Sequence, residues 1–195
     1  MSASAGCWTS ARTCVRGRER RDVAAEDGDG VCVEDDEVDE VGVARLAGFG
    51  AVFDGDGDVG VGKTFLSTCI AKEIMNREYS VLYFSAPQLF NTLAKNAFDK
   101  NDIDAHNMCE YIFDCDLLII DDLGTEYTNA FIASQFFTCI NERLLHRKST
   151  IISTNLSLES LADLYTERSF SRITSRYSLL KIVGDDIRIK KKLEH

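Results

Sequence analysis

Hydrophobic and polar positions alternate in blocks from about residue 60 onward, and the blocks predict strands and helices in turn. Continuous apolar runs of strand length occupy residues 80–86 (SVLYFSA), 115–124 (CDLLIIDDLG) and 149–155 (STIISTN). Runs of this kind are typical of strands buried on both faces of a parallel sheet. Helical spacing of apolar residues occupies 87–98, 129–146 and 157–165. We therefore expect an α/β fold with three layers around a mainly parallel sheet.

Local signals sharpen the ends of these elements. Pro87 is suited to the first turn of the helix that follows the strand at 80–86. Ser157 is a candidate N-cap for the helix over 157–165. A further strand is needed before residue 57, and "GFGAVFDGDG" has to supply it, although Asp54 and Asp56 are unfavourable in a central strand.

A phosphate-binding motif lies between that strand and the next helix. Gly57, four further residues, Gly62, Lys63 and Thr64 match G-x-x-x-x-G-K-[ST]. Glycines allow backbone N–H groups to approach a polyphosphate, and the helix start favours the same anion. The alternative is a glycine-rich turn without a ligand. The expected nucleotide-binding residues are Gly57, Asp58, Val59, Gly60, Val61, Gly62, Lys63, Thr64 and Phe65.

Two acidic residues end the apolar run at 115–124. Asp121 is expected to hold Mg²⁺ together with the Thr64 hydroxyl, and Asp122 to orient and polarise the attacking water. Ligands of such sheets gather at the carboxyl ends of the strands, where both motifs fall. Paired acids after an apolar run can also be a helix cap or a polar turn.

Polar residues beyond the acidic strand complete the candidate set. Asn155 follows the strand at 149–155, where it would contact the attacking water or the γ-phosphate, or serve as a turn residue. Arg168, Arg172 and Arg176 are spaced four apart, which places them on one helical face. That face is a solvated surface, a ridge that contacts DNA phosphates, or a set that reaches a neighbouring subunit's nucleotide.

Composition divides the chain near residue 60. The net charge of the 195 residues is −10; residues 1–62 contain 6 Arg and 14 Asp or Glu, whereas residues 63–195 contain 16 basic and 18 acidic residues. Residues 22–40 contain ten acids and no base, which disfavours a packed core. We predict an acidic leader over 1–47, disordered or not native to the remainder, and an ATPase domain over 48–195.

Other compositional features narrow the class of protein. No apolar run reaches the roughly 20 residues of a membrane span, and the amino terminus lacks the apolar segment of a signal peptide, so a cytoplasmic location is expected. The seven cysteines show no C-x-x-C spacing, which disfavours a metal or disulfide framework. Cys69, Cys115 and Cys139 are expected to be small hydrophobic residues.

Four segments in order, "GDVGVGKTFLS", "YIFDCDLLIIDDLGTE", "INERLLHRKSTIISTNLSLESL" and "ERSFSRITSRY", resemble the DnaC-type helicase loaders of the DnaC/IstB group. The resemblance spans about residues 57–192. It implies an AAA+ P-loop ATPase that uses ATP and Mg²⁺, forms a homo-oligomer, and delivers a replicative helicase to single-stranded DNA. It also implies that Asn155 is the sensor-1 residue, Arg172 the arginine finger and Arg188 a sensor-2-like arginine.

Other readings of the same sequence remain open. An IstB-like helper ATPase for a transposase would share every motif. A small GTPase or nucleotide kinase is disfavoured, because "STNLSLES" lacks the lysine and aspartate of an N-K-x-D motif. A truncated or frame-damaged remnant that binds nucleotide poorly is the last alternative. Basic clusters at 146–148 and 190–192 would contact DNA phosphates or simply face solvent.

Overall fold

The computed structural model describes residues 12–14, 50–54, 60–99 and 101–182, and all structural statements concern these residues. Six of their segments are strands that form one sheet, in the order β1-β3-β4-β5-β2-β6. The five strands from β3 to β6 in this order are mutually parallel, whereas β1 pairs antiparallel with β3 at the edge. The strands are β1 (Arg12–Cys14), β2 (Ala51–Asp54), β3 (Val81–Ser85), β4 (Leu117–Leu123), β5 (Ser149–Thr154) and β6 (Ser178–Lys181).

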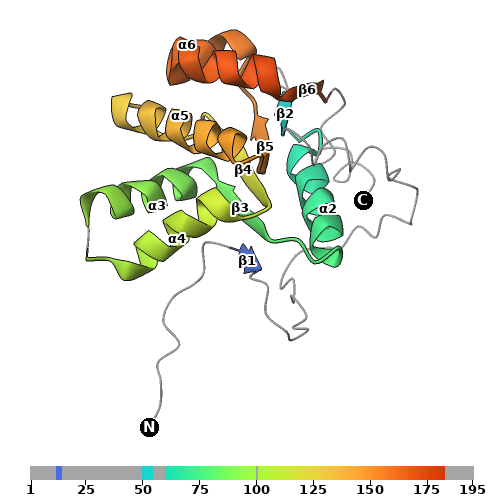
Figure 1. Ribbon diagram of the computed structural model, residues 1–195. Coiled ribbons are helices and arrows are strands. Elements are labelled where there is room, and N and C mark those ends of the chain that lie inside the picture. The colour runs from blue at the N-terminus through green and yellow to red at the C-terminus, as the bar shows by residue number, and fades with distance from the viewer. Residues whose placement is uncertain (1–11, 15–49, 55–59, 100, 183–195) are drawn as a thin grey trace, which may run out of the picture.

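Helices cover both faces of this sheet (Figure 1). Helix α2 lies on one face, and α3, α4, α5 and α6 lie on the other. The bounds are α2 (Lys63–Asn76), α3 (Ala86–Phe98), α4 (Ile103–Asp114), α5 (Ala130–Leu145) and α6 (Leu158–Arg176). The expected three-layered α/β architecture with a mainly parallel sheet is confirmed.

The alternation of side chains along the strands builds two separate cores. In β4, Leu118 and Ile120 pack against α3 to α6, while Leu117 and Ile119 face α2. Both sets are buried, so neither face of the strand needs polar residues, and its sequence is a continuous apolar run. The first three residues of β2 are fully buried in the same way, which explains how a segment that ends at Asp54 occupies a position between β5 and β6.

Helix starts are fixed by side-chain caps. Ser85 forms a capping box with Gln88 at the start of α3, in which Pro87 occupies the first turn as expected. The Ser157 hydroxyl accepts a hydrogen bond from the Ser160 backbone N–H, so the predicted N-cap of α6 is confirmed. Asp102 and Asn129 cap α4 and α5 through their side chains.

Two elements go beyond the sequence prediction. Helix α4 lies in a segment to which the sequence pattern assigned no element. Helix α6 joins the helix predicted over 157–165 to the arginine row, which was expected on a helical face, and it is broken at Thr166, whose φ of 78° and ψ of 147° are not helical. Residues on either side of Thr166 are helical, so α6 is two helical segments joined at one residue.

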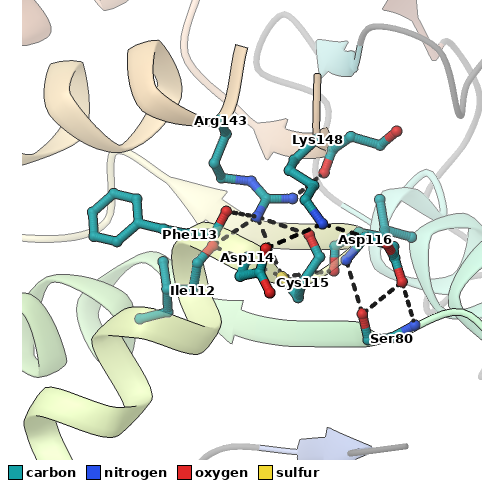
Figure 2. Close-up of polar contacts among 10 residues, drawn as sticks. Ser80, Ile112, Phe113, Asp114, Cys115, Asp116, Arg143 and Lys148 are labelled. Atoms are coloured by element: carbon teal, nitrogen blue, oxygen red, sulfur yellow. Dashed lines mark hydrogen bonds and ion pairs between the residues drawn. The ribbon is translucent and has the colours of Figure 1, made fainter. Parts of the chain in front are cut away.

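A buried arginine ties α4 and α5 to the amino ends of β4 and β5 (Figure 2). The Arg143 side chain is fully buried, and its guanidinium donates to the carbonyl oxygens of Ile112 (2.7 Å), Cys115 (3.1 Å) and Ser149 (2.5 Å). It also donates to the hydroxyl of Thr150 at 2.9 Å. These acceptors satisfy the guanidinium without a carboxylate, and they include carbonyls that the end of α4 leaves unpaired.

A second polar contact lies beside this arginine. Asp116 accepts hydrogen bonds from the backbone N–H and the hydroxyl of Ser80, and Lys148 lies 3.5 Å from the Asp116 carboxylate. Burial opposes ionisation of Asp116, but the bonds from Ser80 and the charge of Lys148 prevail and lower its pKa. The amino ends of the strands are therefore closed by polar contacts, as Figure 2 shows.

Four cysteines are free thiols, namely Cys69, Cys109, Cys115 and Cys139. Cys115 and Cys139 are buried, as expected, whereas Cys69 is only partly buried. Burial raises the pKa of the Cys139 thiol to about 12, which keeps it protonated in the core. The acidic leader predicted over 1–47 lies outside the described residues except for β1, and it stays a prediction. In the described part of the chain, no helix is long and apolar enough to cross a bilayer.

Candidate nucleotide-binding site

The second half of the glycine-rich motif turns tightly into α2. Gly60 has a φ of 82° and Gly62 a φ of 98°, a region that residues with a Cβ rarely adopt. Lys63, the first residue of α2, is buried, with 6% of its surface exposed. Gly57, Asp58 and Val59 lie outside the described residues.

The start of α2 has the properties of an anion site. Its N-cap is Gly62, and no side chain caps the first turn; the first intrahelical bond runs from the Leu66 N–H to the Gly62 carbonyl at 2.9 Å. The first turn of a helix presents N–H groups and the positive end of its dipole. No acidic residue occupies this turn to compete with an anion. Phe65 is half-exposed at the same helix start.

Asp121 joins the glycine-rich motif to the sheet. It is buried near the end of β4, and its Oδ2 accepts hydrogen bonds from the Thr64 hydroxyl at 3.0 Å and from the Tyr83 hydroxyl at 2.5 Å. Its Oδ1 accepts a hydrogen bond from the Ser153 hydroxyl. Three elements, α2, β3 and β5, therefore hold one carboxylate of β4.

Tyr83 remains a proton donor in this arrangement. Burial and the hydrogen bond and negative charge of Asp121 raise the pKa of the Tyr83 hydroxyl far above its ordinary value. The phenol therefore stays protonated at all physiological pH values and donates to the carboxylate.

Asp122 is displaced from the regular strand. Its φ of 55° is left-handed, and the register between β4 and β5 shifts between Ile120 and Leu123. The Asp122 N–H bonds to the Ser153 hydroxyl at 2.9 Å in place of a regular ladder partner. In a bulge of this kind, a side chain no longer follows the alternation between the two faces of the sheet that regular strand residues show.

The turn after β4 contains a second carboxylate. Glu126 Oε2 accepts a hydrogen bond from the Gly124 N–H at 3.1 Å, and its buried Oε1 has no hydrogen-bond partner among the described residues. Burial raises the Glu126 pKa, although the bonds from the backbone N–H groups oppose the shift. Gly124 has a φ of 100°, and a Cβ there would meet the Leu156 side chain at 2.3 Å.

The carboxyl end of β5 lies beside this turn. Thr154 donates its hydroxyl to the Leu123 carbonyl at 2.8 Å and accepts from the Leu156 N–H, which fixes the segment that carries Asn155. The Asn155 Oδ1 is buried and has no partner among the described residues. An unpaired buried acceptor at the end of a strand is available for a donor from a ligand or an ordered water.

The arginine row lies on the second segment of α6. Arg168, Arg172 and Arg176 are all exposed and follow the break at Thr166. Neither Glu167 nor Asp163 forms an ion pair with Arg172 among the described residues. No contact in the described structure joins Arg172 to Asp121 or Lys63 within one chain.

Of the expected site residues, the structure brings Thr64 and Asp121 into direct contact. Asp122 lies within β4 directly after Asp121, and Asn155 follows the end of the neighbouring strand β5. Arg172 is separate on the surface, and Arg188 lies outside the described residues. Tyr83 and Ser153 were not anticipated, because a hydroxyl in an apolar run of the sequence does not show which residue of a neighbouring strand it contacts.

Comparison with known proteins identifies the family. The family model for IstB-like ATP binding proteins matches residues 55–195. The chain belongs to this family. The match covers the glycine-rich motif, both acidic residues and α6, that is, most of the chain and all of the described site.

The relatives include replicative helicase loaders and an ATP-binding protein of an insertion sequence. DnaI of Bacillus subtilis, a replicative helicase loader, is 28% identical over 111 residues, 56% of this chain and 35% of DnaI. The helicase loader DnaC of Escherichia coli K12 is 25% identical over 130 residues, 67% of this chain and 53% of DnaC. A putative ATP-binding protein of insertion sequence IS232 from Bacillus thuringiensis is 28% identical over 139 residues, 69% and 54% of the two chains. This chain spans from about a third to about half of these relatives.

Solved structures place the fold among AAA+ P-loop ATPases. The crystal structure of the DnaC helicase loader aligns with a TM-score of 0.61 at 24% identity and covers 73% of this chain and 87% of that one. DnaA from Aquifex aeolicus bound to AMPPCP aligns with a TM-score of 0.60 at 26% identity and covers 79% and 48%. The expected AAA+ type of P-loop fold is confirmed.

Proposed function

We propose that this protein binds ATP with Mg²⁺ and hydrolyses it. The observation that carries the proposal is the 3.0 Å hydrogen bond between Thr64 and Asp121, which joins the phosphate-binding motif to the acidic strand. Two residues 57 positions apart meet at the carboxyl edge of a parallel sheet, where nucleotides bind in such folds. A glycine-rich turn without a ligand would not require a contact between these two residues.

The donor set fits a magnesium ion. Mg²⁺ takes oxygen ligands and is usually bound by one or two protein oxygens together with substrate phosphates. Thr64 and Asp121 supply a hydroxyl and a carboxylate of this kind, and the Thr64 proton already points to Asp121. When bound, the ion would neutralise charge on the phosphates. Lys63 would neutralise the terminal phosphates from the start of α2.

Asp122 and Asn155 are proposed to act on water at the terminal phosphate. Asp122 would accept a hydrogen bond from the water and orient it for attack. Asn155 would hold the same water or a phosphate oxygen through its side-chain amide. Arg172 would reach the nucleotide of an adjacent subunit, since an exposed guanidinium in trans can stabilise charge in phosphoryl transfer.

The cellular role we propose is loading of a replicative helicase onto single-stranded DNA in the cytoplasm. The similarity to the DnaI and DnaC helicase loaders supports it. A second candidate is a helper ATPase for transposition, supported by the similarity to the IS232 protein. Both roles use the same ATPase site and differ in the partner.

Replacing Lys63 tests the ATPase proposal. We expect Lys63→Ala to lose at least about tenfold in ATP affinity or most of its turnover, because a buried ammonium at the phosphates is removed. The matched control is Lys72→Ala, which removes an exposed lysine from the same helix. Calorimetric titration with ATP and a phosphate-release assay give the two readouts. Equal affinity and turnover in both variants would contradict the proposal.

Capture experiments separate the two roles. The full chain should retain the host's replicative helicase in ATP and release it in ADP if it is a loader, whereas a transposition helper should retain the transposase instead. Binding to single-stranded DNA through phosphates should weaken with salt, by about 0.7 log units in affinity per phosphate contact for each log unit of salt. Binding that is independent of salt would contradict phosphate-mediated contact.

A further inference from the structure

We propose that Tyr83 is a positioning residue for the magnesium site, which fixes the Asp121 carboxylate in the orientation that Mg²⁺ requires. This inference rests on the proposed ATPase function and adds to it a residue outside the phosphate-binding motif and the acidic pair. Its evidence is the network of three hydroxyl donors around Asp121.

The placement of Tyr83 follows from the sheet register. Strand β3 pairs in parallel with β4, and Tyr83 lies opposite Ile119 while Ser85 lies opposite Asp121. The Tyr83 side chain packs with the cluster beneath α2, on the same face as Ile119 and Asp121. A side chain as long as tyrosine can reach forward by two residues, and its hydroxyl lies 2.5 Å from Asp121 Oδ2.

The hydroxyl donors act on both oxygens of the carboxylate. Tyr83 and Thr64 donate to Oδ2, and Ser153 donates to Oδ1. A carboxylate held at both oxygens cannot rotate about its bond to Cβ without breaking these contacts. Three of its four lone-pair sites accept these bonds, so the site that remains, on Oδ1, keeps its direction before any ion arrives.

The same network prepares Thr64. A hydroxyl has one proton and two lone pairs. Because the Thr64 proton is donated to Asp121, its lone pairs remain for a cation. If the Asp121 carboxylate turned, the Thr64 hydroxyl would lose this orientation as well. Tyr83 thus acts on two metal ligands through one hydrogen bond, as outer partners of metal ligands commonly do.

The hydroxyl, rather than the ring, carries the effect. A phenylalanine would fill the same space among the apolar residues beneath α2. The substitution Tyr83→Phe therefore keeps the packing and removes the hydroxyl, which donates to Asp121 and also contacts the Thr68 side chain. Tyr79→Phe is the matched control, because it removes the same atom from an exposed tyrosine four residues away.

The test measures how nucleotide binding depends on Mg²⁺. A fluorescent ATP analogue is titrated with the full chain at Mg²⁺ concentrations from EDTA to saturation, and unfolding in urea is recorded in parallel. We expect Tyr83→Phe to require about tenfold more Mg²⁺ for half-maximal binding, the lower range for loss of an outer-shell partner. Binding in EDTA should be unchanged, and Tyr79→Phe should match the wild type. Ser153→Ala, which frees the other oxygen, should shift the Mg²⁺ midpoint in the same direction.

The outcomes distinguish the inference from the function on which it rests. If the wild type binds the analogue with a clear Mg²⁺ dependence and Tyr83→Phe has the same midpoint, the inference is wrong and the ATPase proposal stands. The same conclusion follows if Tyr83→Phe lowers only the stability in urea. If the wild type binds no analogue at any Mg²⁺ concentration, the ATPase proposal fails, and the inference fails with it.

Discussion

Asp122 has a left-handed backbone at the point where β4 leaves the regular sheet. Aspartate and asparagine adopt this region more readily than most residues with a Cβ, because their short polar side chains can bond locally. The conformation breaks the alternation of side chains, so Asp121 and Asp122 do not simply face opposite sides of the sheet. Adjacent acids can therefore serve one ligand.

Replacing Asp122 separates binding from turnover. Asp122→Asn keeps a residue that tolerates the left-handed backbone, so we expect the fold and the ATP affinity to be retained. Turnover should fall by about 10² to 10⁴, because the amide cannot accept a proton from water. Nucleotide affinity and single-turnover hydrolysis measure the two effects. If Asp122→Asn hydrolyses ATP at the wild-type rate, another acid orients the attacking water, and Glu126→Gln would then be tested first.

Glu126 gives a pH-dependent prediction. Its pKa is raised in the folded state, so the folded protein binds the proton more tightly than the unfolded chain. The carboxyl then favours folding below its unfolded pKa, and this contribution is lost as pH rises through the folded pKa. We expect Glu126→Gln to be more stable than the wild type at neutral pH, with a difference that shrinks as the pH falls through the raised pKa of the folded state and is gone below the ordinary glutamate pKa.

Urea unfolding at a series of pH values measures this effect. The control is Glu110→Gln, which removes an exposed carboxylate from α4. A stability difference for Glu126→Gln that is independent of pH would contradict a titrating carboxyl as its cause.

The sequence was sufficient for the residues that belong to motifs. Lys63, Thr64 and Asp121 could be predicted because fixed spacings and strand ends constrain them. Tyr83 and Ser153 could not, because their contacts with Asp121 depend on the order of strands in the sheet. Strand order is set by tertiary packing, and one hydroxyl in an apolar run does not reveal its neighbour. The roles assigned to all of the site residues, Lys63, Thr64, Asp121, Asp122, Asn155 and Arg172, stay predictions.

At the scale of elements, α6 contains a single non-helical residue in 19. Thr166 is β-branched and exposed, and its φ of 78° is costly for such a side chain. Tyr165, immediately before it, is buried with a hydroxyl that has no partner in the described structure. Packing of Tyr165 on one side and Ile173 on the other holds the break in place.

Relief of this strain is measurable. Thr166→Gly should stabilise the fold by about 1 kcal/mol, since glycine adopts the observed conformation without steric cost. Thr174→Gly, an exposed position with a regular helical backbone in the second segment, should be destabilising by a few tenths of a kcal/mol, about the difference in helix propensity. Chemical denaturation of the three proteins gives the comparison. Equal destabilisation by both glycines would show that Thr166 is not strained.

Two elements show the limits of sequence patterns. Helix α4 buries Ala105, Met108, Cys109 and Ile112 at helical spacing, but small and soft residues give this face a weak signal. Strand β2 was expected only because the topology requires a strand there, against the unfavourable Asp54. Burial of Ala51, Val52 and Phe53 between β5 and β6 outweighs the local preference.

At the scale of the whole molecule, the exposed position of Arg172 bears on the assembly of several subunits. It is exposed on α6, and in one chain no described contact links it to the residues around Asp121. An arginine that acts in trans has to face solvent in a single subunit. A surface pair with Glu167 or Asp163 would have been the local alternative, and the described ion pairs do not include it.

Mixing two inactive variants tests the trans role. Arg172→Ala and Lys63→Ala are each expected to lose most of their turnover, since arginine fingers can contribute about 10³ to 10⁵ in rate. Mixed assemblies should regain part of the activity, because one subunit supplies the intact phosphate-binding motif and the other the arginine. Arg168→Ala in place of Arg172→Ala is the control. Co-assembly without recovered activity would contradict the trans role.

The Arg143 contacts stiffen one end of the molecule. The nucleotide site occupies the carboxyl ends of the strands, whereas Arg143 joins α4 and α5 to the strands at the opposite ends. Separating these elements would leave a buried guanidinium unpaired, at a cost of about 3 to 5 kcal/mol. They therefore form one stiff block. The second segment of α6 meets the first at a single non-helical residue, Thr166, and packs on the same core through Ile173. The helix that carries the arginine row is thus anchored to the same core as α4 and α5, so an arginine that acts in trans would be presented to a neighbouring subunit from a fixed surface.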